Sequence, residues 1–279
     1  MDNKVVFNKD LIRRYDTFGP RYTSYPTAVQ FTADIGVDDY LSWVKNSNED
    51  PIPAPLSLYL HIPFCDTICY YCGCSKVVSK DKSRAEPYIE LLKKEIKLQG
   101  ALFAKDREVT QIHWGGGTPT FLNDEQIYDI IECIRDNFNV PPSDQVEFGI
   151  EVDPRTVDQK RIQNLSNMGF NRISFGVQDF DHEVQDAVNR VQSKEDIKQR
   201  IDDARSQHFQ SINIDLMYGL PKQTLQTFNE TLDTTIKLSP DRIAIYNYAH
   251  LPEMFKPQRR IDEEELPSAE EKLNILQLC

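Results

Sequence analysis

The sequence predicts an α/β protein that forms a partial βα barrel with an N-terminal arm. Short runs of β-branched or aromatic residues alternate with longer amphipathic stretches, which is the pattern of repeated βα units with parallel strands. Polar and glycine-rich motifs follow several of these runs, and in βα barrels the loops after the strand ends form the active face. Six such units are too few to close an eight-stranded barrel, so we expect an open one.

Local signals define the elements in order. Asn123 and Gln126 form a capping pair that begins a helix, and Ser193 is the N-cap of another. Gly100 and Gly169 are expected to end helices. The six predicted strands lie near residues 56–62, 109–114, 146–152, 172–177, 211–217 and 242–248.

The two ends of the chain differ from this repeating region. Residues 1–50 contain scattered Pro, Gly and Tyr with only a short helical pattern near 37–45, so we expect an arm or lid over a barrel domain of residues 51–279. Ser268 and Glu271 form a capping box that begins a last helix, and the sequence stops at Cys279 after about three turns. We therefore expect that this helix is cut.

Composition and charge exclude several classes of protein. A hydrophobic fraction of 39% supports a substantial core. The net charge of −12 argues against a general nucleic-acid-binding or anionic-membrane-binding surface, which needs clustered Lys and Arg. No apolar stretch approaches the roughly 20 residues that span a bilayer. The N-terminus lacks a secretory signal, and the cysteine spacing does not suggest a disulfide framework, so we expect a reducing, cytoplasmic location.

Four closely spaced cysteines are the main chemical signal. Cys65, Cys69 and Cys72 form a C-x3-C-x2-C pattern directly after the first predicted strand, and Cys74 follows. Thiolates at this spacing can bind different irons of one [4Fe-4S] cluster, and three ligands leave one iron open to a small molecule. Structural zinc is the alternative, but zinc sites usually combine two C-x2-4-C pairs separated by a longer loop.

A glycine run, residues 115–117 with Thr118, follows the second predicted strand. It is not a phosphate-binding loop, because no Gly-Lys-Ser/Thr sequence follows it. Consecutive glycines permit either the close approach of a ligand to the backbone or a simple β-bulge. The run alone leaves both interpretations open.

Acidic and histidine side chains on predicted strands are weaker candidates. Glu151 and Asp153 alternate on one strand face, which could suit acid–base catalysis or a divalent metal. Asp215 lies between apolar residues, where a buried and hydrogen-bonded strand carboxylate is the simpler interpretation. His61 and His250 are lesser candidates, because histidines in strands are usually satisfied core residues.

Eight separated motifs together indicate a family. They are GPRYTSYPT at 19–27, HIPFC at 61–65, CYYCGC at 69–74, WGGGTPT at 114–120, IEVDP at 150–154, GVQD at 176–179, NIDL at 213–216 and YNYAH at 246–250. In these motifs the chain resembles the oxygen-independent coproporphyrinogen III oxidases, a radical S-adenosylmethionine (SAM) family. The first and third motifs distinguish this family from a related haem chaperone.

The resemblance implies a three-quarter (β/α)6 barrel, a [4Fe-4S] cluster and SAM, with a second SAM near the first. Cys65, Cys69 and Cys72 are then the cluster ligands, whereas Cys74 is similar to an extra cysteine that does not bind iron and is a candidate catalytic, substrate-side residue. The resemblance also implies a set of SAM contacts: Tyr59, Tyr71, Gly116, Gly117, Thr118, Glu151, Gln178, Arg190, Asp215 and Ala249.

The implied reaction is the oxidative decarboxylation of coproporphyrinogen III to protoporphyrinogen IX by a 5′-deoxyadenosyl radical. This substrate carries four propionates, which an acidic chain repels unless local cations bind them. Arg21 is the candidate for this carboxylate recognition, and the alternative is a surface arginine paired with a nearby acid. We further expect a monomer that receives electrons from a reductant protein such as a flavodoxin or ferredoxin.

Members of this family extend considerably further and have a separate C-terminal domain, which we expect to be missing here. Two alternative functions therefore stay open. One is a non-catalytic remnant that binds a cluster or cofactor, and the other is a radical SAM-like haem chaperone.

Overall fold

The computed structural model describes residues 6–15 and 26–279, and the chain divides into two compact units, Met1–Pro53 and Ala54–Cys279. The first unit contains α1 (Lys9–Tyr15), the short 3-10 helix η1 (Ala28–Gln30) and α2 (Val37–Asn48). At the start of α2 the carboxylate of Asp39 accepts a hydrogen bond of 2.8 Å from the backbone N–H of Gly36. This bond satisfies a donor that the helix start would otherwise leave unpaired.

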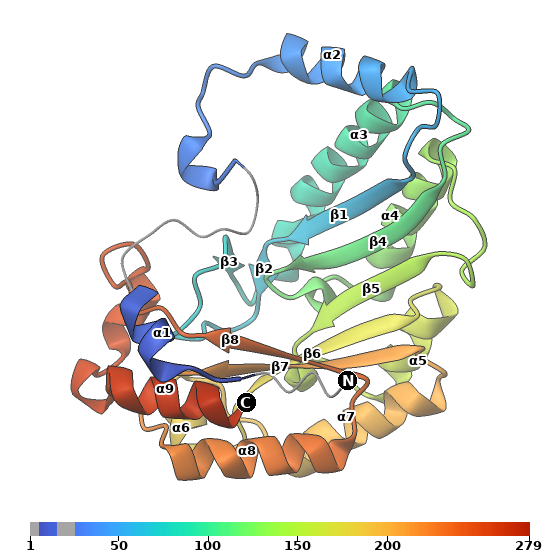
Figure 1. Ribbon diagram of the computed structural model, residues 1–279. Helices are drawn as coiled ribbons and strands as arrows, with labels where there is room; N and C mark the ends of the chain where they lie inside the picture. The colour runs from blue at the N-terminus through green and yellow to red at the C-terminus, as the bar shows by residue number, and fades with distance from the viewer. Residues whose placement is uncertain (1–5, 16–25) are drawn as a thin grey trace. The chain divides into compact units, whose positions relative to one another are not determined.

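Six parallel strands form the sheet of the second unit in the order β1-β4-β5-β6-β7-β8 (Figure 1). The strands are β1 (Leu56–Ile62), β4 (Val109–Gly116), β5 (Glu147–Val152), β6 (Arg172–Gln178), β7 (Ser211–Tyr218) and β8 (Arg242–Asn247). Apart from the separate β2–β3 pair, each strand pairs with the next one along the chain. Because β1 and β8 lie at the two edges, the sheet is an open, curved partial barrel. The predicted α/β fold and its six strands are confirmed.

A second ladder, β2 (Phe64–Cys65) with β3 (Val77–Val78), was not predicted. Its two-residue strands are too short to produce a recognisable alternation in the sequence. The ladder closes the cysteine loop, because the N–H of Val77 donates to Pro63 O at 2.6 Å and that of Ser79 to Cys65 O at 3.0 Å.

Helices connect the strands and lie along the outer face of the sheet (Figure 1). The α-helices are α3 (Glu86–Leu102), α4 (Asp124–Asn137), α5 (Gln159–Asn167), α6 (His182–Ala187), α7 (Lys194–Ser206), α8 (Leu225–Leu238) and α9 (Ala269–Leu278). Short 3-10 helices are η2 (Lys82–Ala85), η3 (Pro119–Phe121), η4 (Pro154–Thr156), η5 (Lys256–Arg260) and η6 (Glu263–Glu265). Among residues 6–15 and 26–279, no helix has the length and apolarity to cross a membrane.

The predicted helix starts are confirmed, and one predicted helix end is wrong. Asn123 and Gln126 form the expected capping box of α4, and Ser193 caps α7. Gly169 follows the end of α5 with a φ of 108°. Gly100, in contrast, lies inside α3, where a Cβ would come within 2.7 Å of the carbonyl oxygen of Asn137. Close packing of α3 on the end of α4 therefore explains this glycine.

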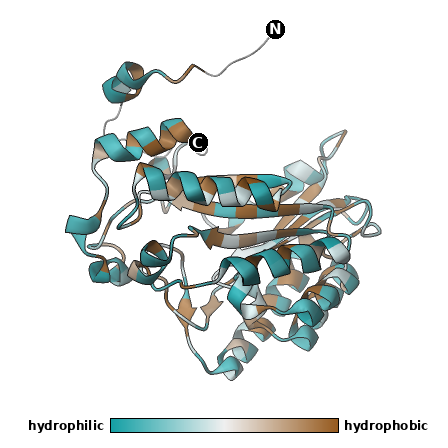
Figure 2. Ribbon diagram, turned by 90° about the horizontal axis from the view of Figure 1, so that it is seen from below, coloured by the Kyte–Doolittle hydropathy of each residue, from teal (hydrophilic) through white to brown (hydrophobic). Residues whose placement is uncertain are grey.

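The central strands present two different faces. One set of alternate residues belongs to the hydrophobic core beneath the helices, as in Phe148, Ile150 and Val152 of β5. The other set is polar or small and lines cavities: Gln111, His113, Glu147, Gly149, Glu151, Arg172, Ser174, Gly176, Ser211, Asn213, Asp215, Arg242, Ala244 and Tyr246. Figure 2 shows hydrophobic residues concentrated in the strands and hydrophilic ones over the helix surfaces.

Candidate functional site

A cavity of about 570 Å³ lies at the carboxyl ends of the strands. Its walls combine the cysteine loop, the glycine run at the end of β4 and the ends of β5, β6 and β7. Most of the predicted site residues line it: Cys65, Cys69, Tyr71, Cys72, Cys74, Gly116, Gly117, Thr118, Glu151, Gln178, Arg190 and Asp215. The structure therefore brings together motifs that are far apart in the sequence.

The cysteine loop presents its thiols to this cavity. Cys69 is buried, Cys65 and Cys72 are half-buried, and Cys74 is exposed. The hydroxyl of Thr118 lies 3.5 Å from the sulfur of Cys65. A hydrogen bond from the Cys74 thiol lowers the pKa of Cys72 to about 5, while the pKa of Cys74 itself is raised.

The glycine run fits closely against the start of the cysteine loop. A Cβ on Gly117 would come within 2.7 Å of Phe64 O and 3.0 Å of the sulfur of Cys65. Gly116 has a φ of 112°, and a Cβ there would meet the ring of His61 at 2.8 Å. Only glycine combines this backbone conformation with such close packing.

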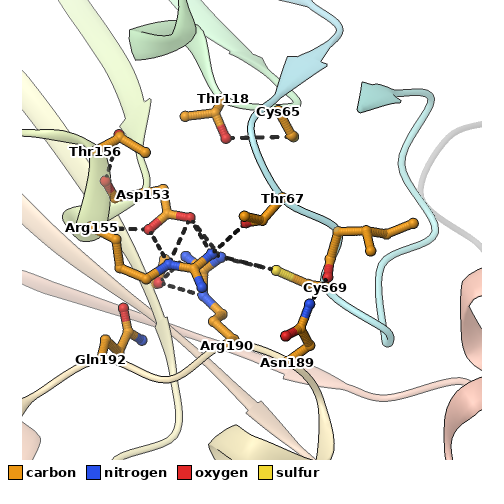
Figure 3. Close-up of polar contacts among 12 residues, drawn as sticks. Cys65, Thr67, Cys69, Thr118, Asp153, Arg155, Thr156, Asn189, Arg190 and Gln192 are labelled. Atoms are coloured by element: carbon orange, nitrogen blue, oxygen red, sulfur yellow. Dashed lines mark hydrogen bonds and ion pairs between the residues drawn. The ribbon is translucent and has the colours of Figure 1, made fainter. Parts of the chain in front are cut away.

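A buried cluster of charges lies beside Cys69 (Figure 3). Nη1 of Arg190 is 3.1 Å from Oδ2 of Asp153 and 3.3 Å from the sulfur of Cys69. Arg155 binds the same carboxylate at 2.7 Å through Nη2. Burial alone raises the pKa of Asp153, but the two arginines outweigh it and lower this pKa. The cluster holds positive charge next to a thiol ligand candidate.

Two further carboxylates line the cavity on neighbouring strands. Oε1 of Glu151 lies 3.2 Å from Nε2 of His113, and its Oε2 accepts from the N–H of Gly116 at 3.3 Å. Asp215 accepts from Ser174 Oγ and Asn213 Nδ2, each at 2.8 Å. Burial raises the pKa of Asp215 despite these bonds. Both carboxylates are oriented by neighbours and still face the cavity.

Gln178 occupies an unusual backbone position at the end of β6. Its φ of 71° lies in the left-handed region, and the register of β6 against β7 shifts between Gly176 and Gln178. Its Oε1 atom is buried and has no hydrogen-bond partner in the structure. An orphaned acceptor that lines a cavity fits a ligand that donates a hydrogen bond.

A buried network directly follows this residue. The carboxylate of Asp179, which is 1% exposed, accepts from Asp181 N at 2.8 Å, Thr231 Oγ1 at 2.7 Å and the side-chain amide of Gln223. Gln223 Oε1 in turn accepts from the N–H groups of Gly219 and Leu220. The network joins the loops after β6 and β7, and burial raises the pKa of Asp179.

Several predicted residues are placed differently. Tyr59 and Ala249, both in the described part of the chain, are not among the residues that line the main cavity. The ring of Tyr59 stacks on His113 at a centroid distance of 6.0 Å, and the carbonyl of Ala249 accepts from Gln258. Arg21 lies outside the described residues.

The histidine candidates have local partners. Nε2 of His61 lies 2.9 Å from Ser75 O, and Nδ1 of His250 lies 2.8 Å from the hydroxyl of Tyr248. These contacts agree with the interpretation of both as satisfied structural histidines.

The sequence patterns did not reveal that Asp153 and Arg155 belong to the charge cluster beside Cys69. Asp153 drew notice only as half of a carboxylate pair, and its two ion pairs with arginine argue against a role in proton transfer. The signal that could have identified Asp153 is its place between the end of β5 and Pro154, which puts it at the carboxyl ends of the strands, where the cavity lies. Among the described residues, no three His, Cys, Asp or Glu side chains form a group that could hold a single metal ion.

Comparisons with known proteins agree with this geometry. The sequence model of the radical SAM superfamily matches residues 59–235. The chain belongs to the radical SAM superfamily. Membership implies a [4Fe-4S] cluster and SAM, and the cavity fits both: three thiols, a glycine cradle beside Cys65 and a free acceptor on Gln178 face one space.

The most informative relatives within the superfamily share one name. The chain is 50% identical over 277 residues to the oxygen-independent coproporphyrinogen III oxidase of Pseudomonas aeruginosa, covering 99% of this chain and 60% of the relative. It is 48% identical to that of Escherichia coli, covering 98% of this chain and 58% of the relative. The chain thus spans about 60% of the length of the curated relatives it matches.

A solved structure gives the same result. Coproporphyrinogen III oxidase (HemN) from Escherichia coli, described as a radical SAM enzyme, superimposes with a TM-score of 0.89 and 46% identity. The match covers 98% of this chain and 60% of that chain. The fold of this chain therefore matches the corresponding part of an enzyme of this family.

Proposed function

We propose that this protein catalyses the oxygen-independent oxidative decarboxylation of coproporphyrinogen III to protoporphyrinogen IX in haem biosynthesis. The observation that carries the proposal is 50% identity to an oxidase of that name along 99% of this chain. The motifs that align on the cavity support it, because they are the motifs through which the sequence resembles the same family.

The cysteines have distinct proposed roles. Cys65, Cys69 and Cys72 hold the cluster, with Arg190 and Thr118 next to two of the sulfurs. When bound, the cluster would supply the electron that cleaves SAM, and the 5′-deoxyadenosyl radical so formed would take a hydrogen atom from a substrate propionate. Cys74 does not bind iron in this proposal and faces the substrate instead.

The remaining cavity residues bind and orient SAM. Gly116 and Gly117 let the backbone approach the methionine end closely, since any side chain would fill that space. Glu151 and Asp215 accept hydrogen bonds from a ribose diol or an ammonium group, and Gln178 offers its free Oε1 atom. Holding these groups in a fixed geometry and excluding water is the contribution of the protein to the reaction.

A second SAM is also proposed, close to the first. A second cavity of about 240 Å³ adjoins the main one and shares Glu151, Asp215 and Tyr246 with it. Its other walls combine polar residues such as Asn213 and Arg242 with the apolar Ile112, Ile150 and Ile173. These groups suit a polar cofactor or an acidic substrate arm. Carboxylate recognition by Arg21, a cytoplasmic location and a monomeric state stay predictions.

The experiment is anaerobic reconstitution of the chain with iron and sulfide, followed by addition of dithionite and SAM. 5′-Deoxyadenosine is measured with and without coproporphyrinogen III, together with the vinyl product. Formation of 5′-deoxyadenosine that rises with substrate, and appears with protoporphyrinogen IX, supports the proposal. Deoxyadenosine without product limits the chain to cofactor cleavage, and a loaded cluster without deoxyadenosine favours the non-catalytic remnant.

Matched variants make the result specific. Cys69→Ser should lose both the cluster absorbance and deoxyadenosine, because Cys69 is buried in the cavity wall. Cys279→Ser makes the same chemical change at an exposed terminal residue and should retain both. Stable, stoichiometric haem binding by a chain that cannot convert the substrate would point to the chaperone instead.

A further inference from the structure

His113 is a cavity residue to which the proposed function gives no role. It lies in the middle of β4 and lines the second cavity, and its side chain is 41% exposed. None of the eight motifs includes it, and it is not among the predicted SAM contacts. Its Nε2 atom nevertheless lies 3.2 Å from Oε1 of Glu151, which is one of those contacts. This contact links His113 to the proposed SAM site.

Glycines on the two strands make room for the contact. His113 on β4 is the register partner of Gly149 on β5, and a Cβ on Gly149 would come within 3.0 Å of the imidazole Nδ1. Glu151 lies close over Gly115 of β4, where a Cβ would come within 2.9 Å of the carboxylate. Each large side chain therefore leans across a glycine of the neighbouring strand, and the two side chains meet on the inner face of the sheet.

The strand on the other side of β4 also limits the orientation of the imidazole. Tyr59 of β1 is the register partner of His113, and its ring is stacked on the imidazole at an interplanar angle of 15°. The imidazole thus has an aromatic ring on the β1 side and a glycine on the β5 side. Neighbours on both sides restrict its rotation and leave Nε2 beside Glu151.

The chemistry of the two groups decides the direction of the hydrogen bond. A carboxylate only accepts, so Nε2 of His113 carries the proton and donates it to Oε1 of Glu151. The other oxygen, Oε2, accepts from the N–H of Gly116 at 3.3 Å. Each oxygen keeps a further lone pair, and the Glu151 side chain is 44% exposed. Two donors therefore orient the carboxylate and leave acceptor capacity for a ligand.

We propose that His113 is a positioning residue for Glu151 in the binding of SAM in the main cavity. The proposal rests on the proposed function, because it takes Glu151 as a SAM contact. A glutamate side chain loses rotational freedom when a ligand binds it, and a carboxylate that is already held in place avoids much of this cost. His113 donates the bond that holds the carboxylate and does not itself touch SAM.

Direct contact between His113 and a ligand is the competing interpretation. Nδ1 of the ring could accept a hydrogen bond from a ligand in the second cavity, which His113 lines. The placement of the side chains favours the indirect role. His113 does not line the main cavity, where most of the predicted SAM contacts lie, whereas Glu151 lines both cavities.

The first test compares three replacements of His113 by equilibrium dialysis of SAM, which requires no turnover. His113→Gln places an amide nitrogen where Nε2 lies and should bind SAM as well as the wild type does. His113→Asn keeps only the nitrogen position of Nδ1, and His113→Leu has no donor, so both should weaken SAM binding roughly 3–10-fold. Iron per chain and the melting temperature should match those of the control His182→Leu, which changes an exposed histidine at the start of α6.

A double-mutant cycle with Glu151→Ala is the second test. If His113 acts through Glu151, His113→Leu should cause no further loss of SAM affinity in the Glu151→Ala chain. An equal loss in both backgrounds would overturn the proposal. Rescue by His113→Asn but not by His113→Gln would also overturn it, because that result assigns a ligand contact to Nδ1.

Two further outcomes complete the test. A loss of iron or a lower melting temperature in His113→Leu, but not in His182→Leu, would show a general packing role and overturn the proposal. Failure of the wild type to form deoxyadenosine with dithionite would contradict the proposed function instead. The dialysis measurements do not depend on that reaction, so the two failures can be distinguished.

Discussion

Replacement of Asp179 by alanine should destabilise the protein strongly. The carboxylate accepts three hydrogen bonds in a buried setting, from Asp181 N, Thr231 Oγ1 and Gln223 Nε2. The Thr231 hydroxyl can turn to a carbonyl of its own helix, which leaves two orphaned donors. At about 1–3 kcal/mol for each, and with relief of the cost of burying a carboxylate, the loss should be about 2–4 kcal/mol. For a domain of this size the melting temperature should fall by roughly 5–15 °C.

The same substitution should also affect the cofactor site. Asp179 directly follows Gln178, whose left-handed backbone costs about 1–2 kcal/mol and needs support from its surroundings. We expect Asp179→Ala to weaken SAM binding about tenfold. Thr235→Ala is the matched control, since Thr235 is fully buried and hydrogen-bonded to Thr231 O, outside the Asp179 carboxylate bonds. It should lower the melting temperature without changing SAM affinity.

Calorimetry and equilibrium dialysis measure the two effects. A melting temperature of Asp179→Ala within about 2 °C of the wild type would refute the network argument. Equal losses of SAM affinity in both variants would show that the effect on binding comes from general destabilisation.

The pH dependence of stability provides a further check. Because burial raises the pKa of Asp179, the free energy of unfolding of the wild type should fall as pH rises through the range just above the ordinary aspartate pKa. Asp179→Asn should lack this fall.

Three other predictions concern the cavity. Gly117→Ala should weaken iron binding roughly tenfold by displacing Cys65, measured as iron per chain. Gly115→Ala should retain iron, because its Cβ would meet the carboxylate of Glu151 and not the cysteine loop. Cys74→Ser should keep the cluster spectrum that Cys72→Ser loses, and equal iron loss in both would contradict their different roles. Arg190→Lys should weaken SAM binding about 10–100-fold, because lysine lacks the planar guanidinium that binds Gly176 O and Asp153 together. An unchanged SAM affinity in equilibrium dialysis would exclude a role of Arg190 in SAM binding.

The sheet could be predicted well because its signals are local. Each strand combines β-branched or aromatic residues with a turn, and the strand ends agree with the prediction to within two residues. The end of α3 was misplaced, because Gly100 has the local character of a helix stop. Position 100 requires a glycine because the backbone of Asn137 packs against it, and this contact between two helices cannot be read from the local sequence.

The site was predictable where one motif contains the whole signal. The three cysteines and the glycine run are each contiguous, and family resemblance supplied the separated Glu151, Gln178 and Asp215. The ion pairs around Asp153 were not predicted, because Arg190 is 37 residues away and becomes a partner only through the fold. The Asp179 network was missed for the same reason, since Gln223 follows it by 44 residues.

The two faces of the strands have a consequence for how such a protein can change during evolution. In β5 the core residues Ile150 and Val152 alternate with Glu151, which lines the cavity. Neighbouring positions are therefore constrained by different requirements, core packing at one and ligand binding at the next. A substitution at an inner position alters what the cavity binds while the packing beneath the helices stays intact. New specificities can therefore arise on an unchanged scaffold, one alternate residue at a time.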